Sequence, residues 1–277
     1  MIYDRKTPCR GSRHSKFWRS LTLWHHFANY FPLKLVKTAE LDPKNNYIVG
    51  SHPHGVLSIG AFGSFCTEAT GFSENFPGIT PYQVTLHGQF QFPFRRELSV
   101  LCGAISSEKE SIEYVLKKAK GNAISIVLGG AEEALDCHPD NYDLRLSTRK
   151  GFVKLALKHG AHLVPMYNFG ENKTYDQLDN RRGTRLRNFQ TTFKRYFGFS
   201  APIFFGRGIF QYSVGLIPYR TPITTVVGKP IAVKQNSTPT QEEIDILHSE
   251  YCKQLIQLFD ENKTKYGIPE NANLNIY

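Results

Sequence analysis

Two histidines stand on either side of one proline in the segment His52-Pro53-His54-Gly55, directly after a short apolar run. Residues 47–49 of that run are typical of a buried strand, and the glycines that bracket the segment predict a tight turn. Pro53 restricts the backbone, so both imidazoles are expected to be held at the end of a strand. An imidazole is the commonest general base for activating a hydroxyl. Polar loop histidines without a chemical role are the alternative interpretation.

A second candidate turn follows the apolar run at residues 123–128, which is typical of a strand buried on both faces. It begins Gly129-Gly130 and carries the carboxylate of Glu133 four residues after the first glycine. In sheets of parallel strands, chemistry gathers in the turns beyond the carboxyl ends of the strands. Both turns occupy such a place, so the sequence predicts that they meet. The alternative for Glu133 is capping of the next helix.

The rest of the chain alternates between helical and strand periodicity. Ser107 and Glu110 predict a capping box before a helix, and Thr240 with Glu243 predicts another before the last helix. Further strands are expected at residues 163–167 and 224–227. This order predicts an α/β fold with a mixed, largely parallel sheet flanked by helices.

Composition narrows the partners of the chain. A formal net charge of +10 favours anionic partners, but the basic residues are scattered and no nucleic-acid-binding motif is present, so no nucleic acid is expected. Five cysteines without CxxC spacing argue against a disulfide scaffold and a structural zinc site, and favour a cytosol-facing location. A metal-dependent hydrolase built on His52 and His54 lacks further ligands at suitable spacing, so no metal is expected.

The N-terminal region forms a separate part of the prediction. Large apolar residues recur near helical spacing among cations between Phe17 and Pro32. They predict an amphipathic helix that lies at a membrane interface, or one that docks on the protein's own core; Pro32 ends it in either case. We therefore divide the chain into a membrane-interface segment, 1–40, and a catalytic domain, 41–277.

Four motifs in the same order resemble those of the diacylglycerol acyltransferase 2 and monoacylglycerol acyltransferase family. They are Tyr30-Phe31-Pro32, the HPHG turn at 52–55, the GGxxEAL element at 129–135, and a long RxGFx[KR]xAxxxGxxLVPxxxFGEN element at 149–172. The resemblance extends from about residue 7 to the C-terminus. Within the family, the segment around Cys66 is most similar to monoacylglycerol acyltransferases.

The resemblance implies a glycerolipid-acyltransferase-like fold on the cytosolic face of the endoplasmic reticulum membrane, with the lipid droplet surface as an alternative. It implies transfer of a fatty acyl group from acyl-CoA to the hydroxyl of a monoacylglycerol or diacylglycerol, without a cofactor. His54 would be the base, with His52 orienting it or sharing the role, and Glu133 would fix the imidazole. Backbone N–H groups where a helix starts after Gly55 would stabilise the oxyanion. The residues expected to contact substrates are Gly55, Gly129, Gly130, Arg149, Lys150, Lys154, Glu171 and Asn172.

Two departures from related enzymes accompany the resemblance. Family members usually begin with a hydrophobic membrane hairpin, which this sequence lacks, as a truncated form or a divergent paralogue would. The acid of a HxxxxD pair is also missing, because Leu57 and Ile59 occupy the corresponding positions. A wax-ester-type alcohol acyltransferase and an inactive lipid-binding paralogue are the alternative functions, and the possibility of a homo-oligomer stays open.

Overall fold

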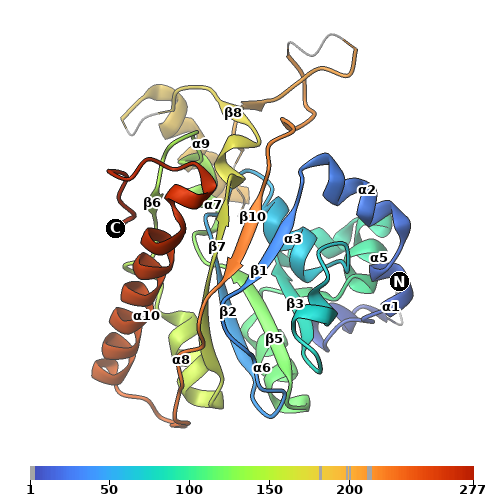
Figure 1. Ribbon diagram of the computed structural model, residues 1–277, viewed down its shortest axis with the longest axis vertical. Coiled ribbons are helices and arrows are strands. Elements are labelled where there is room, and N and C mark those ends of the chain that lie inside the picture. The colour runs from blue at the N-terminus through green and yellow to red at the C-terminus, as the bar shows by residue number, and fades with distance from the viewer. Residues whose placement is uncertain (1–3, 181–182, 198, 200, 211–213) are drawn as a thin grey trace.

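One seven-stranded sheet organises the chain in the computed structural model, which describes residues 4–180, 183–197, 199, 201–210 and 214–277 (Figure 1). Its order is β1-β10-β7-β2-β5-β3-β4. The strands of this sheet are β1 (Lys34–Lys37), β2 (Tyr47–His52), β3 (Thr80–Thr85), β4 (Ala104–Ser106), β5 (Asn122–Val127), β7 (His162–Phe169) and β10 (Thr224–Val227). Two small sheets pair β6 (Asp143–Leu144) with β11 (Asn275–Ile276) and β8 (Asp176–Gln177) with β9 (Phe204–Phe205).

Strand direction defines a functional edge. Strands β7, β2, β5, β3 and β4 run parallel, whereas β10 is antiparallel to β7 and carries β1 parallel to itself. This confirms the predicted mixed, largely parallel sheet. We call the edge at which the five parallel strands end the carboxyl edge. The strand predicted at residues 224–227 begins there, because it runs the other way.

Helices cover both faces of the sheet, with α8 and α10 on one side and α3 on the other (Figure 1). The α-helices are α1 (Lys16–Arg19), α2 (Thr22–Tyr30), α3 (Ile59–Phe65), α4 (Phe72–Asn75), α5 (Pro93–Leu101), α6 (Lys109–Lys118), α7 (Gly130–Leu135), α8 (Gly151–His159), α9 (Arg185–Phe197) and α10 (Gln241–Asn262). Short 3₁₀ helices are η2 (Thr7–Cys9), η3 (His87–Gln91), η4 (Glu171–Lys173) and η5 (Thr264–Tyr266).

Strand β2 lies in the middle of the core. Successive residues of a strand point to opposite faces, and in β2 both faces are buried. Ile48 packs into the cluster formed with α6, α8 and α10, while Tyr47 and Val49 pack into the cluster with α3 and α4. The carboxyl end of β2, which carries the histidines, is therefore fixed from both sides.

The N-terminal segment packs on the protein rather than standing apart from it. Trp24 and Phe31 are buried in clusters that include residues of α3, and the buried guanidinium of Arg19 pairs with Glu68 at 2.7 Å. Most of the apolar face predicted for a membrane interface is thus occupied by core, while Phe17 and Leu23 remain exposed. None of the described helices combines the length and hydropathy needed to cross a bilayer.

The two predicted capping boxes have different outcomes. The box at Thr240 is confirmed, because its hydroxyl accepts from the N–H of Glu243 and the Glu243 carboxylate accepts from the N–H of Thr240. The box at Ser107 is wrong. Helix α6 has Glu108 at its N-cap without a side-chain cap, and the Ser106 hydroxyl, one residue earlier than predicted, accepts from the Glu108 N–H.

Candidate active site

The first histidine of the turn is a buried structural residue. His52 is the last residue of β2, and its Nε2 lies 3.0 Å from the Tyr251 hydroxyl on α10. That hydroxyl donates to the carbonyl of Gly50, so it accepts from His52, which is then protonated on Nε2. Burial lowers the pKa of His52 to about 3, so the ring stays neutral. The His52 side chain is fully buried, and its predicted share in catalysis stays a prediction.

The second histidine faces the surface with one free nitrogen. His54 is partly exposed, and its Nδ1 lies 2.8 Å from the carbonyl oxygen of Gly55. A carbonyl oxygen only accepts, so Nδ1 carries the proton and Nε2 keeps its lone pair. No described residue forms a hydrogen bond with this Nε2. Desolvation lowers the pKa of His54, which keeps the imidazole neutral and able to take a proton.

Glu133 holds the backbone of this turn. Its Oε1 accepts from the N–H of His54 at 2.7 Å and its Oε2 from the N–H of Arg145 at 2.9 Å. The sequence predicted a hydrogen bond between the Glu133 carboxylate and the imidazole. In the structure the carboxylate accepts from the main chain, and the imidazole is bonded to the Gly55 carbonyl instead. The glycine before α7 makes room for it, because a Cβ at Gly129 would lie 2.1 Å from the Glu133 carboxyl carbon.

Glu171 holds the other side of the turn. This fully buried carboxylate accepts from the N–H groups of Ile59 and Gly60, at 2.7 and 2.8 Å, and so caps α3. It also lies against Gly55, whose φ of +63° requires glycine, since a Cβ there would be 2.5 Å from the Glu171 Cγ. Two of the helix N–H groups predicted to stabilise an oxyanion, those of Ile59 and Gly60, are thus occupied. In the structure Glu171 fixes the turn, and its predicted contact with substrate stays a prediction.

Asn168 and Tyr251 belong to this arrangement and were not predicted. Asn168 on β7 donates to the Ser51 hydroxyl and to the His52 carbonyl, and accepts from the Thr225 hydroxyl. A buried asparagine in an otherwise apolar strand was the available signal, because buried amides need partners. Tyr251 gave no signal, since its apolar neighbours made it look like ordinary core.

The three basic residues that were predicted to contact substrates lie in different surroundings. The Arg149 guanidinium lies near the Gly129-Gly130 turn, because a Cβ added at Gly130 would be 3.5 Å from the Arg149 Nη2. Lys150 pairs with Asp245 of α10 at 2.7 Å. Lys154 lines a cavity of about 280 Å³ between the first turns of α6 and α8, together with Ser107, Lys109, Ile112, Gly151, Leu155 and Lys158.

A second cavity, of about 250 Å³, opens beside Pro53. It is lined by Glu171 and Asn172, but not by His54. The Asn172 side chain donates to the carbonyl of Asn141 and accepts from the Cys137 thiol. His54 lines neither of these two cavities.

The two buried carboxyl groups give a pH dependence of stability. Burial raises the pKa of Glu133 and that of Glu171 from 4.5 to about 7. Because these pKa values rise on folding, the stability that each group contributes is fully present below about pH 4.5 and is lost as pH rises to about 7. We expect wild type to lose stability relative to Glu133→Gln over that range, measured by urea unfolding. A constant difference between the two proteins would contradict the raised pKa of Glu133.

The structure places one partly exposed imidazole, that of His54, in a rigid turn at the carboxyl edge, and known proteins identify the family of the chain. A family model described as "Diacylglycerol acyltransferase" matches residues 1–277. The chain is 51% identical over 275 residues to 2-acylglycerol O-acyltransferase 1 of Bos taurus, covering 99% of this chain and 82% of that protein. It is 47% identical over 274 residues to acyl-CoA wax alcohol acyltransferase 1 of Homo sapiens, covering 99% and 84%.

A crystal structure of the 1-acyl-sn-glycerophosphate acyltransferase PlsC from Thermotoga maritima aligns with a TM-score of 0.47 and 10% identity, over 87% of this chain and 79% of that one. The family match and the full-length relatives show that the chain belongs to the diacylglycerol acyltransferase family. It is an acyltransferase, as its motifs predicted.

Proposed function

We propose that the protein transfers a fatty acyl group from acyl-CoA to the hydroxyl of a monoacylglycerol, forming diacylglycerol, with His54 as the general base. The supporting observation is the His54 ring, whose Nδ1–H donates to Gly55 and leaves Nε2 free on the exposed side. Nε2 would take the hydroxyl proton while the oxygen attacks the thioester carbonyl carbon. The carbon–sulfur bond then breaks and CoA leaves as a thiolate, which needs neither a metal nor another cofactor.

The acceptor is tested directly by offering competing alcohols. Labelled oleoyl-CoA is supplied with 2-monoacylglycerol, diacylglycerol or hexadecanol, and the labelled product is separated. An excess of labelled diacylglycerol over the products of the other two acceptors supports the proposal. Preference for hexadecanol would favour the wax-ester alternative, for which the relative named as a wax alcohol acyltransferase is the precedent. Folded protein that binds lipid without turnover would favour the inactive paralogue.

The lysine-lined cavity suits the phosphates of CoA. Lys154 enters it from α8, and Lys109 and Lys158 line it as well. The cavity extends from the first turns of α6 and α8 to Lys158 in the last turn of α8, so its positive charge comes from lysine side chains. Glu113 pairs with Lys158 at 2.9 Å and so compensates one of the charges. The cavity begins at Ser107, just beyond β4, at the same edge of the sheet as the histidine turn.

A substitution in this cavity should weaken the recognition of the 3′-phosphate of CoA. Removing a charged hydrogen bond costs about 1.5–3 kcal/mol, so we expect Lys154→Ala to raise KM for oleoyl-CoA about 10- to 100-fold with little change in kcat. Oleoyl-dephospho-CoA lacks the 3′-phosphate, and its KM should change much less. Lys117→Ala is the matched control, because Lys117 pairs with Glu113 but does not line the cavity. Equal effects on both thioesters would reject this assignment.

We propose further that the carboxyl edge lies on a membrane surface, at the cytosolic face of the endoplasmic reticulum. Leu57, beside the histidine turn, is 54% exposed, Phe94 is 94% exposed and Phe210 is 90% exposed. These three residues follow β2, β3 and β9 in the sequence. Exposed aromatic side chains on a chain with a net charge of +10 suit anionic lipid.

Flotation with phosphatidylcholine–phosphatidylserine vesicles tests this orientation. We expect the double variant Phe94→Asp, Phe210→Asp to reduce the bound fraction several-fold, because the aspartates would be buried among lipid headgroups. Ile246→Asp is the control, since Ile246 is exposed on α10. Phe17→Asp tests the N-terminal segment that the sequence predicted as the interface. Loss of binding in Phe17→Asp with full binding of the double variant would reverse the proposed orientation.

A further inference from the structure

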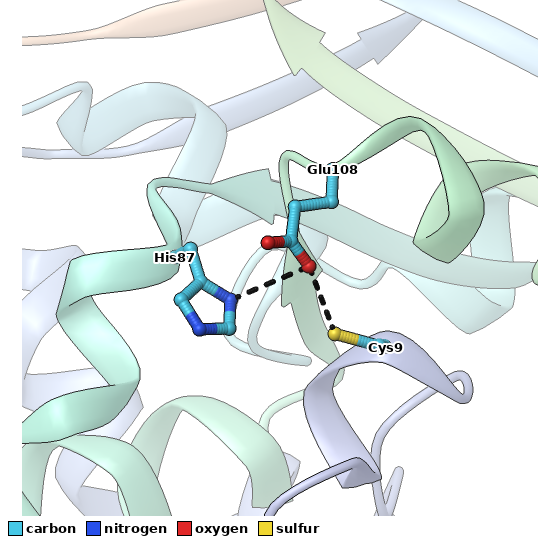
Figure 2. A group of neighbouring side chains, drawn as sticks. All are labelled: Cys9, His87 and Glu108. Carbon is cyan, nitrogen blue, oxygen red and sulfur yellow. Dashed lines mark hydrogen bonds and ion pairs between the residues drawn. The ribbon is translucent and has the colours of Figure 1, made fainter.

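Three potential metal ligands from distant parts of the sequence meet on the surface. Cys9 ends η2, His87 begins η3, and Glu108 is the residue before α6 (Figure 2). Their ligand atoms all lie within 4.8 Å of one another. The Cys9 thiol donates to Glu108 Oε2 at 3.3 Å, and the same oxygen is 3.6 Å from His87 Nδ1. None of these residues belongs to the histidine turn.

Two of the three distances between the ligand atoms agree with those around a tetrahedral zinc ion, and the third is within 4.8 Å. Bonds of about 2.0–2.3 Å from zinc to nitrogen, oxygen and sulfur place the ligand atoms about 3.3–3.8 Å apart. The two distances from Glu108 Oε2, 3.3 and 3.6 Å, fall in that range without movement of the backbone. Figure 2 shows the imidazole and the thiol converging on this carboxylate from two sides.

We propose that Cys9, His87 and Glu108 form a zinc site, with water completing the coordination. A thiolate, an imidazole and a carboxylate are the ligand types that zinc takes, and the thiolate disfavours magnesium and calcium. On binding, the sulfur–hydrogen bond breaks, the sulfur–zinc bond forms and the proton leaves to solvent. Zinc therefore replaces the thiol proton that Cys9 now shares with Glu108.

The surroundings fit a ligand set of this kind. The hydroxyl of Ser106, a fully buried residue, lies 3.2 Å from His87 Nδ1 and accepts from the Glu108 N–H at 3.3 Å, so it lies beside two of the three ligands. Zinc would replace the contact of Nδ1 with this hydroxyl, while the bond to the Glu108 N–H stays and holds the residue that supplies the carboxylate. The metal would join the N-terminal segment to the connections after β3 and β4, and it takes no part in acyl transfer.

Zinc and cobalt binding to the purified full-length chain test the site. We expect one equivalent of zinc in competition with a fluorescent chelator, and a thiolate-to-cobalt charge-transfer band when Co²⁺ is used. Cys9→Ser should abolish the band, and Cys9→Ser, His87→Ala and Glu108→Gln should each weaken zinc binding at least about 10-fold. Binding should tighten as pH rises, because the thiol proton is released.

Cys252→Ser is the matched control, because Cys252 Sγ lies 3.8 Å from a ring nitrogen of His248 and forms the rival cysteine–histidine pair. It should leave the cobalt band unchanged. Persistence of the band in Cys9→Ser, or its loss in Cys252→Ser, would overturn the proposal, as would a wild-type zinc affinity equal to that of a variant carrying Cys9→Ser, His87→Ala and Glu108→Gln together. Glu108→Gln keeps the test decisive if Cys9→Ser folds poorly, and circular dichroism monitors the fold of each variant.

Discussion

His54→Ala is expected to lower kcat for acyl transfer by about 10²- to 10⁴-fold, the usual contribution of a positioned general base. The substitution removes the Nε2 lone pair together with the ring's bond to the Gly55 carbonyl, while the Glu133 bond to the His54 N–H and the packing of Glu171 on Gly55 do not depend on the ring. The free energy of unfolding should therefore change little. Transfer from labelled oleoyl-CoA gives the rate, and added imidazole should restore part of it.

The pH profile of the wild-type enzyme gives an independent check. Desolvation holds the pKa of His54 below its ordinary value of 6.5, so kcat/KM should fall with a midpoint below that pH as the imidazole becomes protonated. His25→Ala is the matched control, because His25 is an exposed histidine of α2. Wild-type rates in His54→Ala, or an unchanged acid limb in a partly active His54 variant, would assign the base elsewhere.

Glu171→Ala is expected to lower the free energy of unfolding by about 2–5 kcal/mol and to lose most activity. Both carboxylate oxygens accept backbone N–H groups of α3, and a buried donor left without a partner costs about 1–3 kcal/mol. The same side chain packs against Gly55, so its removal also frees the turn that places His54. Urea unfolding measures the first effect and acyl transfer the second.

Glu171→Gln separates the two roles of this residue. Its amide oxygen can still accept one N–H while the volume is kept, so its loss of stability should be smaller than that of Glu171→Ala. Glu242→Gln is the surface control, because Glu242 is an exposed carboxylate in the first turn of α10. If Glu171→Ala were as stable as this control, the carboxylate would not be holding the start of α3.

Local sequence patterns predicted several strands and helices of the fold well. The runs at 123–128 and 163–167 became β5 and β7 with small shifts of their ends, and the Thr240 box begins α10 as expected. These features depend on neighbours in the sequence, where periodicity and capping chemistry are informative. The wrong capping box at Ser107 shows the limit of such patterns. Strand β4 extends to Ser106, and α6 begins after Glu108 without a side-chain cap.

The long-range hydrogen bonds of the site could not be predicted from local sequence patterns. The sequence named His54 and Glu133 together but could not show that the carboxylate binds the main chain, 79 residues away, rather than the ring. Glu171 reaches α3 across 112 residues. Partners at this separation are set by which strands lie side by side in the sheet, and a single sequence does not contain that order.

Tyr251 extends this dependence to the end of the chain. The residue whose hydroxyl meets His52 follows it by 199 positions, on the last α-helix. During synthesis both histidines and the two carboxyl groups that hold their turn therefore leave the ribosome before Tyr251 does. The His52 ring acquires its hydroxyl partner only when α10 has been made and has docked on the sheet.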